Sequence, residues 1–128
     1  MTHVFPVKVY YEDTDMGGVV YYANYLKFIE RARSEIVADL GIDQLAMKAE
    51  GHVFVVTRVE ADYLAPARMG DALQVRTTHR PASKVRWVFE QAVWRDETCL
   101  FRAEVTAVCM SDAGRPQRLP VALTSGKT

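Results

Sequence analysis

The sequence predicts an α+β protein in which one curved antiparallel sheet packs on one long helix. Apolar residues recur at helical spacing in one long segment only, whereas the segments before and after it alternate with the period of two that is typical of strands. The strand-like segments after Gly51 follow one another through short turns, and strands connected in this way pair antiparallel. Because 128 residues fall within the usual size of one domain, residues 1–128 are expected to form a single domain.

The first predicted strand covers residues 4–11, where Val7, Val9 and Tyr11 alternate with Lys8. A cluster of two aspartates, a threonine and two adjacent glycines follows it. Such residues favour turns, because an aspartate side chain bonds its neighbouring backbone and glycine accepts a positive φ. We therefore expect a loop between this strand and the helix.

A long amphipathic helix is predicted over residues 24–40. Asn24 fits the N-cap position and Gly41 fits the position just after the last turn, so both ends carry boundary signals. The apolar face recurs at spacings of three and four and consists of Tyr25, Phe28, Ile29, Ala32, Ile36, Val37 and Leu40. A second, shorter helix is expected over residues 42–50.

Four more strands are predicted after Gly51, where the apolar period changes to two. They cover residues 53–63, 73–77, 85–94 and 100–110. Residues 95–98 indicate a hairpin loop between the last two strands. From Thr124 onward the chain is expected to fray.

The charge balance argues against two kinds of partner. Sixteen basic and sixteen acidic residues cancel, so no bulk positive field would hold nucleic acid or an anionic membrane. No apolar run approaches the ~18 residues of a membrane span, and the N-terminus lacks a basic segment followed by an apolar core. We therefore expect a cytoplasmic protein with no transmembrane segment and no nucleic-acid partner. The two cysteines form no metal-binding pattern, so no metal site is expected.

The loop before the long helix is the best candidate for chemistry. A helix N-terminus offers free N–H groups and a partial positive charge, which suit an anion or a developing oxyanion. A carboxylate such as that of Asp15 can act as a nucleophile or as a general base on water. This combination fits acyl transfer. From the residues alone the alternative stays open that Asp13 and Asp15 are turn or capping residues, and that Gly17 and Gly18 only shape a turn.

The same region resembles a known family. The run from Tyr11 to Leu26, YEDTDMGGVVYYANYL, is similar to the signature of the hotdog-fold acyl-CoA thioesterases. Within them it most resembles the branch that includes the Tol-Pal-associated (YbgC-type) enzymes and the 4-hydroxybenzoyl-CoA thioesterases. Outside this run, the resemblance extends to Leu64-Ala65-Pro66, to Gly70-Asp71 and to the tail at 115–120, and thus over nearly the whole chain.

The resemblance implies a hotdog fold, in which a long central helix is wrapped by a curved antiparallel sheet of five or six strands. It places the catalytic carboxylate on Asp15 and the oxyanion donor on the backbone N–H of Tyr22, whereas Asp13 has no catalytic counterpart. Whether Asp15 attacks the thioester carbonyl or activates water stays open. Many Tol-Pal-associated members have histidine where this chain has Tyr22, which leaves the acyl preference open between aliphatic and aromatic groups.

Further site residues are implied by the same resemblance. The expected substrate-binding residues are Gly18, Val19, Tyr25, Val55, Ser83, Lys84 and Arg86. The basic segment 79–86 is expected to meet the phosphates of coenzyme A, with Arg115 and Arg118 as second candidates. From the residues alone, this segment can equally be a solvated turn.

The family forms its site between two subunits, so a homodimer, assembling further into a dimer of dimers, is implied. Coenzyme A is expected as part of the substrate, with no other cofactor. The alternatives are an acyl-carrier-protein thioesterase, or a hotdog module that binds acyl-CoA or a partner such as Tol-Pal without turnover. A hotdog dehydratase would need a histidine at the site, and none lies between Asp15 and Leu40.

Overall fold

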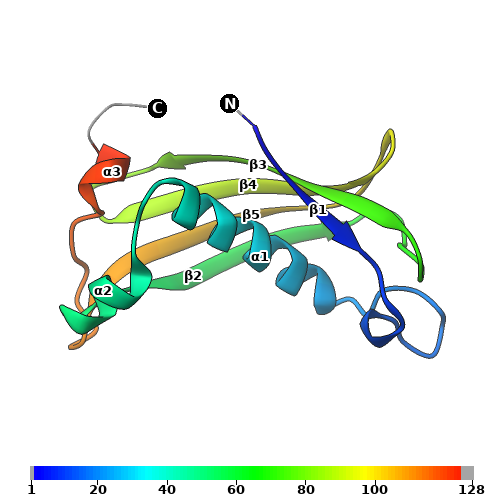
Figure 1. Ribbon diagram of the computed structural model, residues 1–128, viewed down its shortest axis with the longest axis horizontal. Coiled ribbons are helices and arrows are strands. Elements are labelled where there is room, and N and C mark those ends of the chain that lie inside the picture. The colour runs from blue at the N-terminus through cyan, green and yellow to red at the C-terminus, as the bar shows by residue number, and fades with distance from the viewer. Residues whose placement is uncertain (1, 125–128) are drawn as a thin grey trace.

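The computed structural model describes residues 2–124, and within them five strands form one antiparallel sheet (Figure 1). The strands pair in the order β1-β3-β4-β5-β2, so β1 and β2 are the two edges. Their bounds are β1 His3–Lys8, β2 His52–Tyr63, β3 Ala72–Pro81, β4 Arg86–Arg95 and β5 Thr98–Ser111. The helices are α1 Asn24–Asp39, α2 Gln44–Ala49 and α3 Val121–Thr124, with a 3-10 turn η1 at Tyr11–Asp13. Fraying was expected from Thr124 onward; Thr124 is the last residue of α3, and residues 125–128 lie outside the described residues.

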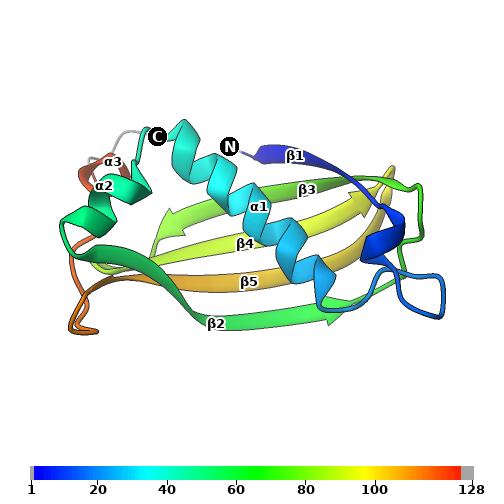
Figure 2. The same cartoon turned by 60° about the horizontal axis from the view of Figure 1, so that its bottom comes forward.

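Helix α1 crosses one face of the curved sheet obliquely, and its other side is open (Figure 2). Its buried positions are Tyr25, Phe28, Ile29, Ala32, Ile36 and Val37, which match the predicted apolar face except for the half-buried Leu40. Against them the sheet places Val75, Trp87, Phe89, Phe101 and Val105. Burial of each large apolar side chain contributes about 1.5–3 kcal/mol, so this interface is the main source of stability.

The two ends of α1 differ in how well the sequence predicted them. Ala23 occupies the N-cap position and makes no side-chain capping bond, so the prediction of Asn24 as N-cap is wrong. Asn24 is instead the first helical residue, and its Nδ2 donates to the Asp13 carbonyl at 3.0 Å. At the other end Gly41 has φ of +77°, and the N–H groups of Gly41 and Ile42 donate to the carbonyls of Ala38 and Val37. This is the glycine-terminated end that was predicted.

The outer face of the sheet is polar. Ion pairs join Arg58 to Glu60 and Arg80 to Glu90 there, and the Arg76 guanidinium lies 4.6 Å from the centre of the Trp94 indole ring. An antiparallel sheet commonly buries one face and leaves the other in water, as this one does.

Among residues 2–124, no helix has the length and apolar character needed to cross a bilayer.

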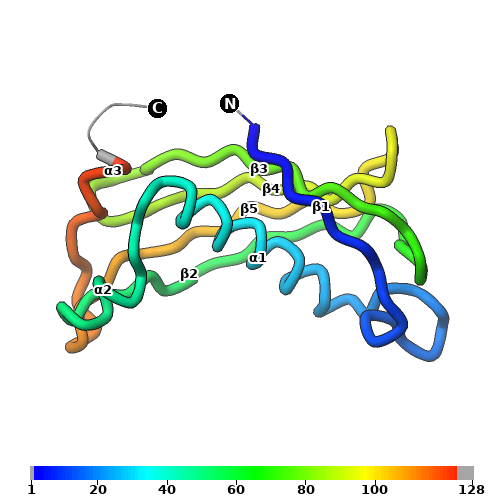
Figure 3. Tube along the Cα trace, in the orientation of Figure 1, coloured from blue at the N-terminus to red at the C-terminus, as the bar shows by residue number. Residues whose placement is uncertain are grey.

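The connections gather at two opposite ends of the molecule (Figure 3). One end carries η1, the loop that leads into α1, and the connection between β2 and β3. The other carries α2, α3 and the turn between β3 and β4. Because a strand rises ~3.3 Å per residue, the ten residues of β4 hold these ends roughly 30 Å apart.

Candidate active site

A tight hairpin presents Asp15 between η1 and α1. Thr14 and Val20 form an antiparallel bridge, the Asp15 N–H donates to the Val19 carbonyl at 2.9 Å, and the Gly18 N–H donates back to the Asp15 carbonyl at 2.9 Å. Gly18 has φ of +78°, a conformation that costs a side-chain-bearing residue about 1 kcal/mol or more. The sequence makes this hairpin because a glycine stands where the chain needs the left-handed conformation.

The Asp15 carboxylate is exposed, and one of its oxygens is held in place. Oδ1 accepts a hydrogen bond from the Gly17 N–H at 2.9 Å, which is the bond of an Asx turn. Within residues 2–124, Oδ2 accepts no hydrogen bond, and no lysine, arginine or histidine pairs with this carboxylate. The hairpin thus fixes the position of the carboxylate and leaves one oxygen open to a reactant.

Asp13 has a structural role in joining η1 to the entrance of α1. Its side chain is buried, and Oδ2 accepts from the Tyr10 N–H at 2.8 Å. Its carbonyl accepts from the Tyr21 N–H and from the Asn24 side chain. Asp13 therefore ties η1 to the start of α1.

The entrance of α1 offers a free backbone donor at Tyr22. Within residues 2–124 the Tyr22 N–H has no hydrogen-bond acceptor, whereas its carbonyl accepts from the Tyr63 hydroxyl at 3.1 Å. The Tyr22 ring is exposed and stands edge-on to Tyr63, with 6.2 Å between the ring centres. An unsatisfied N–H at a helix start is the kind of group that binds an oxyanion.

Tyr25 lies in the core below this entrance. Only 3% of the residue is exposed, its ring stacks on Phe101 at 4.9 Å, and its hydroxyl accepts from the Ala67 N–H at 3.0 Å. Burial raises the pKa of the Tyr25 hydroxyl, while the bond from Ala67 opposes that rise. This packing favours a structural role, so contact between Tyr25 and substrate stays a prediction.

Gly18 is exposed and Val19 is half-buried in the hairpin, and their contact with substrate also stays a prediction.

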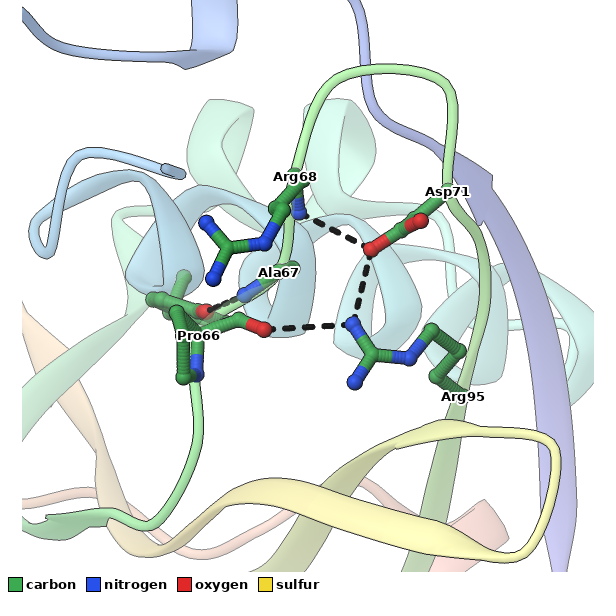
Figure 4. Close-up of polar contacts among 6 residues, drawn as sticks. Pro66, Ala67, Arg68, Asp71 and Arg95 are labelled. Atoms are coloured by element: carbon green, nitrogen blue, oxygen red, sulfur yellow. Dashed lines mark hydrogen bonds and ion pairs between the residues drawn. The ribbon is translucent and has the colours of Figure 1, made fainter. Parts of the chain in front are cut away.

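The connection between β2 and β3 supports the hairpin from behind. The Ala67 carbonyl accepts from the Val20 N–H at 2.8 Å, and the Asp71 carbonyl accepts from the Val9 N–H at 3.0 Å. Arg95 fixes this connection, because its Nη1 lies 2.9 Å from Asp71 Oδ2 and 3.1 Å from the Pro66 carbonyl (Figure 4). Neither Asp71 nor Arg95 was among the predicted site residues. The sequence indicates a turn at Gly70-Asp71, but it does not indicate that Asp71 pairs with Arg95. That pairing depends on the register of β4.

The Asp71 carboxylate has a pKa below its ordinary value. Partial burial acts to raise the pKa, but the hydrogen bonds from the Arg68 N–H and from the Arg95 guanidinium outweigh it. Asp71 is therefore ionised at neutral pH and contributes a charge-assisted bond to the support of the hairpin.

The basic residues predicted to meet coenzyme A lie at the opposite end of the sheet. Ser83 Oγ accepts from the N–H groups of Val85 and Arg86 and so shapes the turn between β3 and β4. Lys84 and Arg86 are exposed, and neither pairs with a carboxylate within residues 2–124. They are free to meet an anion there.

His79 does not belong to this basic turn, because β3 extends to Pro81 rather than ending at the predicted Thr77. Its Nδ1 accepts from the Trp87 indole N–H at 3.0 Å, so this nitrogen carries no proton. Burial lowers the pKa of His79, and the nearby His3 lowers it further. The predicted cationic segment is therefore reduced to the residues of the turn itself.

Val55 lies at the same end of the molecule as the turn. It pairs with Val108 on β5, and Val108 pairs in turn with Arg86 on β4, so the three residues form one row across the sheet. Phe54 and Val56 face the core side of β2 and line a cavity of about 140 Å³ under α1. Because strand neighbours alternate between faces, Val55 points to the other side, and its contact with substrate stays a prediction.

Comparison with known proteins decides the family. The model of the thioesterase-like superfamily matches residues 9–125. The chain belongs to this superfamily. It is 42% identical over 123 residues to the acyl-CoA thioester hydrolase YbgC of Escherichia coli O6:H1, a match that covers 94% of this chain and 92% of the relative.

Solved structures agree with this assignment. The chain is similar to a probable thioesterase from Bartonella henselae, with 35% identity, a TM-score of 0.87 and coverage of 94% of this chain and 100% of the other. It is also similar to a 1,4-dihydroxy-2-naphthoyl-CoA thioesterase from Synechocystis, with 25% identity, a TM-score of 0.89 and 98% coverage of both. The predicted enzyme class, a thioester hydrolase, and the predicted hotdog fold are thereby confirmed. The wrapped helix is confirmed only in part, since the sheet of one chain covers one side of α1.

Proposed function

We propose that this chain hydrolyses acyl-CoA thioesters, with Asp15 as the reacting carboxylate and the Tyr22 N–H as the donor to the thioester oxygen. Two features of the chain support these roles. One oxygen of Asp15 is anchored by Gly17 and the other is open, and the Tyr22 N–H has no acceptor within residues 2–124. The relatives named acyl-CoA thioesterases make coenzyme A the carrier to test first.

The observation that carries the proposal is the separation of the predicted site residues into two groups. Asp15 and Tyr22 lie at one end of the sheet, beside Tyr63 at the end of β2. Lys84 and Arg86 lie at the other end, in line with Val55 near the start of β2. A single chain therefore does not bring the reacting carboxylate and the basic turn together.

A homodimer paired antiparallel through the β2 edges would bring the two groups together. β2 is an edge strand of twelve residues whose outer positions are mostly exposed, and an open edge of that length is a template for pairing with another chain. In a two-fold antiparallel pair, the start of one β2 lies beside the end of the other. The basic turn of one subunit would then face the Asp15 hairpin of its partner.

The chemistry follows from these roles. The Tyr22 N–H stabilises negative charge as it develops on the thioester oxygen. Asp15 either attacks the carbonyl carbon, forming a mixed anhydride that water then cleaves, or takes a proton from the attacking water. In both routes the carbon–sulfur bond breaks, coenzyme A leaves as its thiol and the acyl group leaves as a carboxylic acid. The acyl group is short-chain or aromatic in this proposal, and Lys84 and Arg86 meet the phosphates of coenzyme A.

Asp15→Asn tests the role of the carboxylate. We expect the variant to keep its fold and its affinity for acyl-CoA while kcat falls at least ~10²-fold, the scale on which single catalytic groups act. The measurement is steady-state thioester hydrolysis across acetyl-, butyryl-, hexanoyl-, palmitoyl- and 4-hydroxybenzoyl-CoA. The matched control is Glu12→Gln, which removes the same charge from an exposed residue nearby and should leave kcat unchanged. Full activity of Asp15→Asn would instead mean that Asp15 only shapes the turn.

A further inference from the structure

Arg33 extends from the middle of α1 into the cavity under the helix. Its Nη1 donates to Gln91 Oε1 at 2.9 Å, and its guanidinium lies 5.9 Å from the centre of the Phe89 ring. Gln91 is itself fixed, because its Nε2 donates both to the Ile29 carbonyl and to Thr77 Oγ1, at 3.0 Å each. A network anchored in the core therefore holds the guanidinium in one position.

Arg33 forms no ion pair within the described chain. No carboxylate of residues 2–124 lies within 4.0 Å of its guanidinium. Glu30 lines the same cavity and its charge acts to raise the pKa of Arg33 against the effect of burial. Its Oε2 accepts from the Ser34 hydroxyl at 3.0 Å rather than from Arg33. Burial lowers the pKa of Arg33, yet a guanidinium stays charged in proteins. A partly buried cation with unused N–H donors is costly unless an anion pairs with it.

The cavity around Arg33 is small and mostly apolar. Its volume is about 140 Å³, close to that of cavities that hold one benzene ring, roughly 150 Å³. Aromatic rings of Phe54, Trp87 and Phe89 form much of its wall, together with the side chain of Val56. Such a space accepts a short hydrocarbon segment or one ring, and Arg33 with Glu30 supplies its charged groups.

The location of the cavity connects it to the proposed site. Phe54 and Val56 belong to the first half of edge strand β2, the half that the proposed dimer places beside the partner's Asp15 hairpin. A thioester held at that hairpin can therefore extend its acyl group towards this cavity. An acyl-binding role for this cavity rests on the proposed function in this respect.

We propose that the cavity under α1 binds the acyl group and that Arg33 selects acyl groups ending in a carboxylate. The apolar part of the acyl chain packs against the aromatic walls, and the distal carboxylate accepts hydrogen bonds from the guanidinium. A planar guanidinium suits this role because it presents two parallel N–H donors to a carboxylate. The substrate class is thus the CoA thioester of a short dicarboxylic acid.

Two substrates of equal chain length test this selectivity. Glutaryl-CoA and pentanoyl-CoA differ only in having a carboxylate or a methyl group at the far end of the same chain. We expect wild-type kcat/KM to be about 10- to 100-fold higher for glutaryl-CoA, the range of one hydrogen bond to a charged group. This ratio needs no variant, and a wild-type ratio of one or less would overturn the proposal.

Arg33→Met is the variant that assigns the preference to this residue. It should lower kcat/KM for glutaryl-CoA at least ~10-fold and change that for pentanoyl-CoA less than ~3-fold. Arg33→Lys keeps the charge without the planar fork and should retain part of the preference. The matched control is Arg31→Met, which removes the same charge from the exposed face of α1 and should alter neither substrate. Equal losses on both substrates in Arg33→Met would contradict the assignment.

A binding measurement separates this inference from the catalytic proposal. The Kd of the non-hydrolysable thioether analogue of each CoA ester reports recognition of the acyl group without turnover. Tighter binding of the glutaryl analogue that depends on Arg33 supports the inference even if Asp15 proves not to be catalytic. Hydrolysis that depends on Asp15, combined with equal affinity for the two analogues, would reject the inference and leave the proposed function standing.

Discussion

Asp13 and Asp15 are identical side chains two residues apart, but their hydrogen bonds indicate different roles. Asp13 is buried and its Oδ2 caps the turn at Tyr10, whereas Asp15 is exposed with one oxygen unused within residues 2–124. A buried carboxylate bonded to backbone N–H groups stabilises structure, and an anchored but accessible one can react. The same reasoning distinguishes Tyr22, whose N–H is free, from Tyr25, whose side chain is packed and bonded.

Gly17 tests whether the position of the Asp15 carboxylate matters. A Cβ added at Gly17 would lie 3.2 Å from Asp15 Oδ1, so Gly17→Ala displaces the carboxylate by a few tenths of an ångström while the backbone accepts alanine. Because a displacement near 1 Å can cost as much as 10²-fold, we expect this smaller one to lower kcat about 3- to 10-fold. Gly41→Ala is the control: it should cost about 1 kcal/mol of stability through its left-handed φ but leave kcat unchanged. An unchanged kcat in Gly17→Ala would show that this contact does not position the carboxylate.

Single-residue features were predictable from the sequence where they depend on near neighbours. The turn-forming glycines, the helix end at Gly41 and the Asp15 loop all belong to this kind. His79 and Arg33 were not predictable, because their partners Trp87 and Gln91 lie on β4 and the contacts depend on how β4 pairs with β3 and packs against α1. Asn24 misled because its side chain bonds backwards to Asp13 rather than to the first turn of α1.

At the scale of elements, the periods of three to four and of two identified α1 and all five strands. The main error in strand length lies in β3, which continues to Pro81. Its last part, Thr78 to Pro81, alternates poorly in sequence and is strand because β4 pairs with it from Trp87 to Glu90. Pairing with β4 thus makes β3 longer than the local sequence pattern predicts.

The connection between β2 and β3 gives a prediction about stability and pH. Asp71→Asn removes the charge that holds Arg95, so we expect the free energy of unfolding at pH 7 to fall by about 1–2 kcal/mol. Because the folded pKa of Asp71 lies below its ordinary value of 3.8, the ion pair stabilises fully above that value and its contribution is lost as pH falls through the folded pKa. Chemical denaturation of both proteins at pH 7 and pH 3 measures the difference, which should shrink at the lower pH.

Asp62→Asn provides the control for this prediction. It breaks the Asp62–Arg102 pair on the exposed outer face, where both side chains are about two-thirds exposed, and should cost less than about 0.5 kcal/mol. Equal effects of the two substitutions, or a pH-independent effect of Asp71→Asn, would show that the bond from Arg95 does not stabilise the connection.

At the scale of the whole molecule, the distance between its two ends determines what one chain can do. The Asp15 hairpin and the basic turn lie at opposite ends of strands that are roughly 30 Å long. No periodicity in the sequence reports this separation, because it follows from the order β1-β3-β4-β5-β2 and from the direction of each strand. The resemblance implied a site between subunits, and this separation supplies a physical reason for one.

Complementation between two defective subunits tests the shared site most directly. One chain carries Asp15→Asn and the other carries Lys84→Glu with Arg86→Glu. The two chains are co-expressed with different tags, and hybrid dimers are purified. If each site uses Asp15 of one subunit and the basic turn of the other, a hybrid has one intact site and one doubly defective site. We predict kcat/KM of about half the wild-type value per dimer, far above either parent variant, as expected for independent sites. Hybrid activity no higher than the mean of the two parents would show that each chain works alone and would contradict this account.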